Sequence, residues 1–119
     1  MITNRLAAQL LVSGLDDWLH LADISWAAGQ FARSDQTEDV ISVATEALAT
    51  LLEHEFIQIG EVSDGGFFEW DVTNDEAIDR VRRAWLALDR EPQPGDVCWI
   101  ANSALGNERA RDVANDGVT

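Results

Sequence analysis

The spacing of hydrophobic residues changes near residue 55, and this change constrains the fold more than any other feature of the chain. Before it, apolar residues recur at helical spacing, in the stripe Val40, Ala44, Ala47, Leu48, Leu51 and Leu52. After it they alternate, with Ile57 and Ile59 on the face opposite Phe56. A period near 3.6 indicates a helix and a period of two indicates a strand, so the fold must combine both.

Flanking signals mark both ends of this junction. Asp35–Gln36–Thr37–Glu38 has the pattern of a capping box, which predicts the start of the helix, and His54 sits at its end. The strand runs through Val62 into Ser63–Asp64–Gly65–Gly66, whose residues tolerate the positive φ of a tight hairpin turn. Phe67–Trp70 is the expected partner strand.

Before this helix the chain predicts three shorter elements. Residues Asn4–Ser13 carry one apolar stripe and reach Gly14, a common helix stop. Trp18–His20 is a short extended stretch, and helical spacing resumes from Leu21 until Gly29.

After the hairpin, Thr73–Asn74–Asp75–Glu76 forms a second capping box and opens a helix that ends before Pro92. A short strand is expected at Val97–Ile100, followed by a final helix from Asn102 or Ser103 through about Val113. A length of 119 residues suits one core, so we expect a single α+β domain over 1–113 and a frayed tail over 114–119.

The order of these elements resembles a winged helix-turn-helix domain. The resemblance runs from Arg5 to Asp71 and includes the joins at 19–24 and 51–57; Gly95–Trp99 resembles small uncharacterised proteins of the actinobacterial type. It implies three helices plus a β-hairpin wing, followed by a helix, a short strand and a C-terminal helix. In that family the third helix reads the major groove of DNA.

Charge opposes this use of the fold. The chain has 22 Asp and Glu, eight Arg and no Lys, for a formal net charge of −14. Over residues 1–70 two arginines oppose twelve carboxylates, a net of 2 − 12 = −10, and the third helix carries no basic residue. Such a surface repels phosphate, so nucleic acid and anionic membranes are not expected partners. General solubility or a halophilic host would also explain the acidity.

The leading hypothesis is therefore a non-catalytic, acidic protein-binding module. It would dock on a basic protein, as an immunity or inhibitor protein or as an adaptor, because complementary charge speeds association. The expected partner-binding residues are Glu38, Asp39, Glu46, Asp64, Glu69 and Trp70. Trp18 and Trp70 lie beside charged residues and are predicted as surface anchors, whereas Trp26, Trp85 and Trp99 are predicted core residues.

The alternative is a dimeric winged-helix DNA-binding regulator whose cations come from the fourth helix and from Arg109. Its anion-binding residues would be Arg80, Arg82, Arg83 and Arg90. Ion pairs on the helix surface with Asp79, Asp89 and Glu76 are the more ordinary explanation of the same arginines.

We expect no enzyme activity, no cofactor and no metal. His20 and His54 lack partners at metal-ligand spacing, and Cys98 lies in an apolar run typical of a buried thiol. We also expect a cytoplasmic protein without a signal peptide, because the N-terminal residues lack a basic segment followed by an apolar one.

Overall fold

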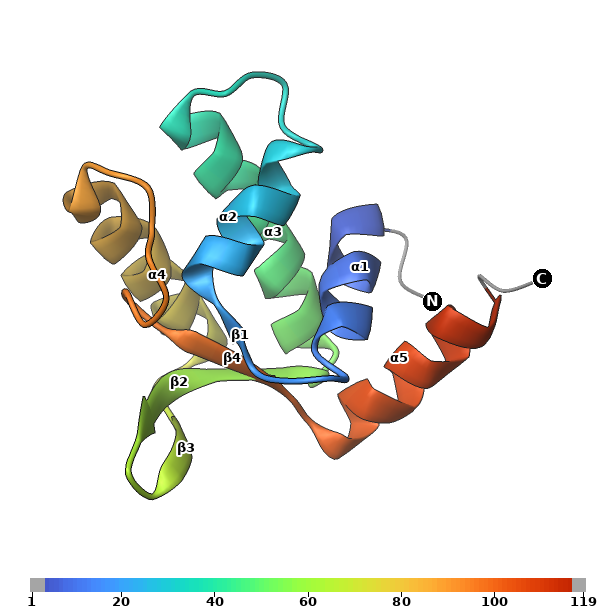
Figure 1. Ribbon diagram of the computed structural model, residues 1–119. Coiled ribbons are helices and arrows are strands. Elements are labelled where there is room, and N and C mark those ends of the chain that lie inside the picture. Colours follow the sequence, from blue (N-terminus) through green and yellow to red (C-terminus); the bar gives the residue numbers. More distant parts are fainter. Residues whose placement is uncertain (1–3, 117–119) are drawn as a thin grey trace.

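The computed structural model describes residues 4–116 and shows an α+β arrangement of five helices and one four-stranded antiparallel sheet over that range. The elements follow one another in the predicted order. Helices α1, α2 and α3 stand on one side of the sheet, with α4 and α5 towards opposite ends of it (Figure 1).

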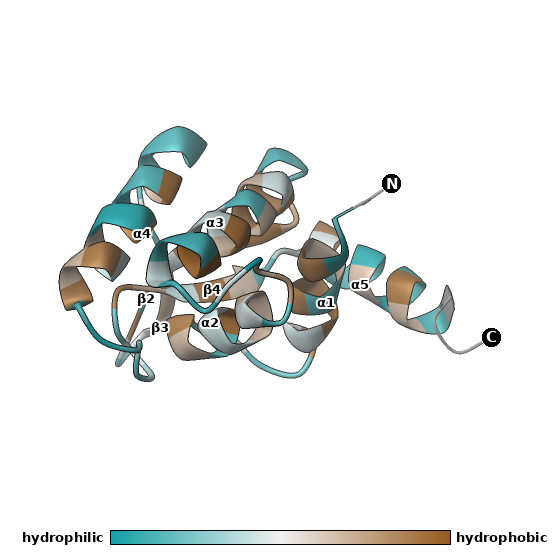
Figure 2. Ribbon diagram, turned by 90° about the horizontal axis from the view of Figure 1, so that it is seen from above, coloured by the Kyte–Doolittle hydropathy of each residue, from teal (hydrophilic) through white to brown (hydrophobic). Residues whose placement is uncertain are grey.

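The central helix is α3 (Thr37–Glu53), which packs against α1 (Arg5–Ser13), α2 (Leu21–Gly29) and α4 (Asn74–Leu88). Its predicted stripe is buried from Ala44 onwards, while Val40 is half-buried and Ile41 takes the innermost position of the first turns. In Figure 2 much of the α4 ribbon is teal, whereas α1 and α3 carry more brown.

The predicted capping box at the start of α3 is wrong. The N-cap residue is Gln36, one position later than expected, and its side chain makes no capping hydrogen bond. Ser34 organises the turn instead: its hydroxyl accepts from the Gln36 N–H at 3.1 Å and donates to the Asp39 carboxylate. With the helix starting at Thr37, Asp35 lies outside the capping position.

The second predicted capping box is confirmed as an N-cap at Thr73, although the Glu76 side chain bonds to the Thr73 hydroxyl and not to its backbone N–H. Thr73 caps α4, with its hydroxyl accepting from the Glu76 N–H at 3.2 Å and donating to the Glu76 carboxylate at 3.1 Å. The helix buries Ala77, Val81 and Trp85 and ends at Asp89, which has a left-handed φ of +51°.

The sheet joins distant parts of the chain. Its order is β1 (Leu19–His20), β4 (Trp99–Asn102), β2 (Ile57–Ser63) and β3 (Gly66–Glu69). The hairpin β2–β3 closes where Ser63 pairs with Gly66, whose φ of +111° needs glycine. The partner of β1 is β4, with Leu19 opposite Ile100.

Two predicted boundaries in the C-terminal part are shifted. The last strand begins at Trp99 rather than at Val97, because Val97 has a φ of +66° and cannot continue an extended strand. Helix α5 spans Ala104–Asp116, so residues 114–116 of the expected tail are helical, and residues 117–119 lie outside the described range. Ser103 starts α5, accepting from the Gly106 N–H at 2.9 Å.

Candidate binding surface

The acidic residues predicted to bind a partner do not gather at one place. Glu38 and Asp39 lie in the first turn of α3 and Glu46 lies farther along the same helix. Asp64 is in the hairpin turn and Glu69 ends β3. The start of α3 and the hairpin occupy opposite ends of the molecule (Figure 1), so one small partner segment cannot contact both groups.

Trp70 is not a surface anchor, which corrects the prediction. Its side chain is only 9% exposed, because α4 covers it: the Arg80 guanidinium carbon lies 3.9 Å from the centre of a Trp70 ring. The Trp70 Nε1 is buried without a hydrogen-bond acceptor. Trp70 therefore joins the end of the hairpin to α4 by cation–π and apolar contact.

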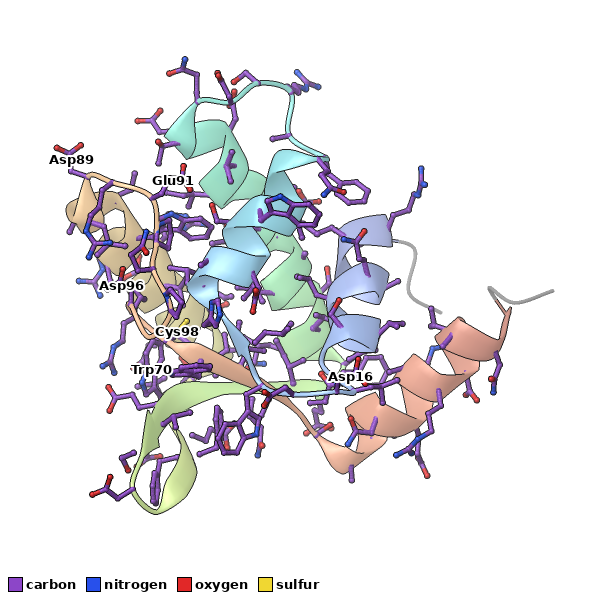
Figure 3. The ribbon with its side chains drawn as sticks, viewed as in Figure 1. Asp16, Trp70, Asp89, Glu91, Asp96 and Cys98 are labelled. Carbon is purple, nitrogen blue, oxygen red and sulfur yellow. The ribbon has the colours of Figure 1, made fainter. Side chains whose placement is uncertain are left out.

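The start of α3 does form part of a groove, together with the end of α4 and the loop after it. The groove has a volume of about 630 Å³. Its lining residues are Gln36, Thr37, Glu38, Asp39, Trp85, Leu86, Asp89, Arg90 and Glu91. Asp89 and Glu91 lie on the loop that follows α4 (Figure 3). Four carboxylates thus surround one arginine.

That arginine is already paired. Arg90 Nη1 and Nη2 donate to the two carboxylate oxygens of Asp96 at 2.7 and 3.3 Å. The hydrogen bond from Arg90, with another from the Gln93 N–H at 2.8 Å, lowers the pKa of Asp96 below its ordinary value. The Arg90–Asp96 pair links two parts of the loop that follows α4. Because Asp96 offsets the charge of Arg90, the four groove carboxylates give the groove its negative charge.

Trp26 is a second tryptophan whose predicted exposure is wrong. It was predicted to be in the core, yet its side chain is 73% exposed. Helix α2 buries Leu21, Ile24, Ser25, Ala27 and Ala28. At 100° per residue, Trp26 points about 200° from both Ile24 and Ala28, on the outer side of the helix. The helical spacing of α2 alone contains this signal.

Hollows lie on both sides of Trp26. One, of about 450 Å³, lies towards α3; its lining residues are Ala22, Ser25, Trp26, Gly29, Ser34, Asp35, Val40 and Glu91. The other, of about 360 Å³, lies towards α1; its lining residues are Gln9, Leu10, Ser13, Leu19, Ala22, Asp23, Trp26 and Ala27. We call these two hollows and the Ala22–Trp26 ridge between them the Trp26 surface.

Glu91 connects the Trp26 surface with the acidic groove, since it lines both. It is held towards α2 by the Ser25 hydroxyl, which donates to its carboxylate at 3.3 Å. The two hollows and the groove together are lined by six carboxylates (Asp23, Asp35, Glu38, Asp39, Asp89, Glu91) and by one arginine. An exposed indole therefore stands within a strongly negative surface.

The arginines of the alternative site are engaged within the protein. Arg83 pairs with Asp79 at 2.8 Å, as expected. The other partners differ from the expected ones: Arg80 lies over Trp70 and 3.5 Å from Glu61, Arg90 binds Asp96, and Arg82 donates to the Thr45 hydroxyl at 3.3 Å. The four side chains thus do not form one free basic patch.

The remaining reactive side chains have structural contacts. Cys98 is buried as predicted, and desolvation raises the pKa of its thiol to about 12. His20 packs edge-on against Trp99, and His54 caps α3 while stacking on Phe56. Residues 4–116 contain no group of three or more His, Cys, Asp or Glu placed to hold a metal ion. Over that range no helix has both the length and the apolar run needed to cross a membrane.

Comparison with protein families, curated proteins and solved structures gives no match for this chain.

Proposed function

We propose that this chain is a non-catalytic acidic module that binds a basic protein. The observation that carries the proposal is Trp26, a large apolar side chain left 73% exposed between hollows lined with carboxylates. Tryptophan is enriched at the energetic centres of protein interfaces, where surrounding contacts exclude water from it. A rim of carboxylates selects partners of the opposite charge.

The net charge of −14 supports the same proposal at longer range. A negative surface attracts a basic protein over about one Debye length, roughly 8 Å at physiological salt, and this speeds encounter. In a cell, such a protein would act as an immunity protein or inhibitor that binds a basic enzyme, or as an adaptor in the cytoplasm.

The proposal includes a winged-helix fold, without the DNA binding that usually goes with it. It is supported by the order of the elements from α1 to the β2–β3 hairpin. The sheet adds a feature of its own, since β4 lies between β1 and the hairpin. A winged-helix plan with an acidic third helix fits a protein that has kept the scaffold and exchanged nucleic acid for a protein partner.

The alternative function, a dimeric DNA-binding regulator, has less support. Its arginines contact Asp79, Glu61, Asp96 and Thr45 in the same chain. For these arginines to bind DNA phosphates, their contacts within the chain would first have to break. The surrounding surface is negative, as DNA is, and would repel it.

Affinity capture tests the proposal. The immobilised protein is incubated with lysate of the organism that encodes it, at about 50 mM and about 300 mM NaCl, with and without nuclease. We expect one basic protein to be enriched at low salt and lost at high salt, regardless of nuclease. Recovery of nucleic acid, lost on digestion, would overturn the proposal in favour of the regulator.

A pair of charge-reversal variants locates the site. Glu38→Lys with Asp39→Lys changes the acidic groove, while Glu108→Lys with Asp112→Lys changes α5 by the same charge. We expect the first variant to lose the captured protein and the second to retain it. Equal losses would show that the partner responds to net charge and has no site at the groove.

A further inference from the structure

The outer side of α2 is a helix face without a partner element in the described chain. Its inner side is buried against α3 and α1, while Ala22 and Trp26, one turn apart, form an outward ridge. Trp26 is the most exposed of the large hydrophobic side chains in the described range. Leaving an indole in water forfeits the apolar free energy that covering it would release.

Each hollow beside this ridge combines the indole with carboxylate. On the α1 side Trp26 shares a hollow with Asp23, and on the α3 side it shares one with Asp35 and Glu91. Neither hollow is lined by Arg, so a cation entering either one meets negative charge together with an aromatic ring.

This combination selects arginine. A guanidinium group is planar, stacks on an aromatic face, and can at the same time donate two hydrogen bonds to a carboxylate. An ammonium group is a strongly hydrated point charge and stacks less well. The protein uses the same pairing internally, where the Arg80 guanidinium carbon lies 3.9 Å from the centre of a Trp70 ring beside Glu61.

Because the Trp26 ridge lies between two hollows, it also sets the distance between two guanidinium groups bound in them. Two guanidinium groups stacked on opposite faces of one indole are separated by about twice the distance between a guanidinium plane and the ring. In an extended chain, side chains at positions i and i+2 are about 7 Å apart, which matches that separation. Glu91 in one hollow and Asp23 in the other would each accept hydrogen bonds from one of the two guanidinium groups.

We propose that the Trp26 surface binds an extended Arg-X-Arg segment of the partner, with the two guanidinium groups placed on either side of the Trp26 indole. The inference rests on the proposed function and specifies the chemistry that the partner presents. The occupant is therefore a basic peptide segment rather than a second copy of this acidic chain, which would bring like charges together.

Synthetic peptides provide the probe. The peptides are Gly-Ser-Arg-Ser-Arg-Ser-Gly, its double-lysine counterpart, and a version in which four serines separate the two arginines. Each is titrated into the full-length protein and followed by the NMR signals of the indole N–H groups. We expect the Arg-Ser-Arg peptide to bind about tenfold more tightly than the lysine peptide and to shift the Trp26 signal. The widely spaced peptide should bind more weakly than the Arg-Ser-Arg peptide.

Matched variants separate the indole from the charge. Trp26→Ala preserves net charge and removes an exposed side chain, so the protein should stay folded and lose about tenfold in affinity for the Arg-Ser-Arg peptide. Trp18→Ala is the control, because Trp18 is also exposed but lies beside Phe67 of the hairpin. It should leave the affinity unchanged.

The outcomes distinguish this inference from the proposed function. Equal affinity for the arginine and lysine peptides, or an unchanged affinity in Trp26→Ala, would overturn the Arg-X-Arg site while leaving an acidic binding module intact. Absence of peptide binding to the wild-type protein would also overturn it. The proposed function is decided separately, by whether the full-length protein captures a basic protein in the lysate experiment.

Discussion

Trp26 and Trp70 show how little the neighbouring residues in sequence say about the exposure of a large side chain. Trp70 lies beside charged residues in sequence and is nevertheless covered by Arg80 from α4. Trp26 has no charged residue beside it in sequence and is nevertheless exposed, because α2 turns it outward. The stability of the fold should therefore depend on Trp70, and partner binding on Trp26.

Substitution of Trp70 tests its structural role. Because the ring is 9% exposed, Trp70→Ala should lower the free energy of unfolding by about 3–5 kcal/mol. Trp70→Phe should cost clearly less, since the buried Nε1 makes no hydrogen bond that a phenyl ring would lose. Urea unfolding followed by circular dichroism measures both. Equal costs would mean that the indole N–H has a partner in solution.

Cys98 gives a pH prediction. Burial raises the pKa of its thiol from the ordinary value of 9.0 to about 12, so the folded state favours the neutral form. The stabilisation is present in full below pH 9 and is lost as pH rises from about 9 towards 12, where the unfolded chain ionises first.

Two measurements check this prediction. The unfolding midpoint in urea should fall between pH 9 and pH 11 in the wild type and fall less in Cys98→Ala. At pH 8 a thiol reagent should label native Cys98 only at the rate at which the protein opens. Rapid labelling of the native protein would contradict the burial of the thiol.

At the scale of elements, α5 depends on one close backbone approach. Ser103 joins it to the connection between α3 and β2, with its hydroxyl donating to the Glu55 carbonyl at 2.8 Å and its N–H to the Phe56 carbonyl at 2.9 Å. Gly106 then lies so near that a Cβ there would be 1.9 Å from the Phe56 carbonyl oxygen. Only glycine lets α5 pack in this position.

Two glycine substitutions test this contact. Gly106→Ala should destabilise the protein by about 1–3 kcal/mol or more, because backbone must shift to admit the methyl group. Gly29→Ala is the matched control: Gly29 lies in α2 with nothing within 4 Å of its added Cβ, so the change should be neutral or stabilising by up to about 1 kcal/mol. Thermal unfolding compares them. A larger loss for Gly29→Ala would contradict the packing of α5.

At the scale of the whole molecule, the net charge of −14 should oppose folding and promote binding. The folded state holds these carboxylates within a radius of gyration of 13.5 Å, comparable with the Debye length of about 10 Å at 0.1 M salt. Added salt screens their mutual repulsion, and it also screens attraction to a basic partner.

Salt should therefore act on stability and binding with opposite signs. Between about 0.01 and 0.3 M NaCl we expect the midpoint of thermal unfolding to rise, by roughly 4 °C for each 1 kcal/mol gained. Over the same range the affinity for the captured partner should fall. A midpoint that decreases with salt would mean that the exposed ion pairs, such as Arg83–Asp79, outweigh the repulsion.

The sequence was enough to predict the α+β class and the order of the elements. The helical stripe of α3, the alternation in β2 and the Thr73 cap are local patterns, and local patterns set local structure. It also determined the burial of Cys98 and the strongly negative charge, because an apolar run and a count of ionisable groups need no fold to be recognised.

Contacts between residues far apart in the chain became visible only in the folded protein. The placement of β4 between β1 and β2, the cover of Arg80 over Trp70, and the meeting of Glu91 with Ser25 and Trp26 join segments far apart in the chain. Such contacts follow from the packing of whole elements, and no spacing within one element encodes them. The acidic residues could therefore be counted from the sequence, while the surface that a partner would meet required the fold.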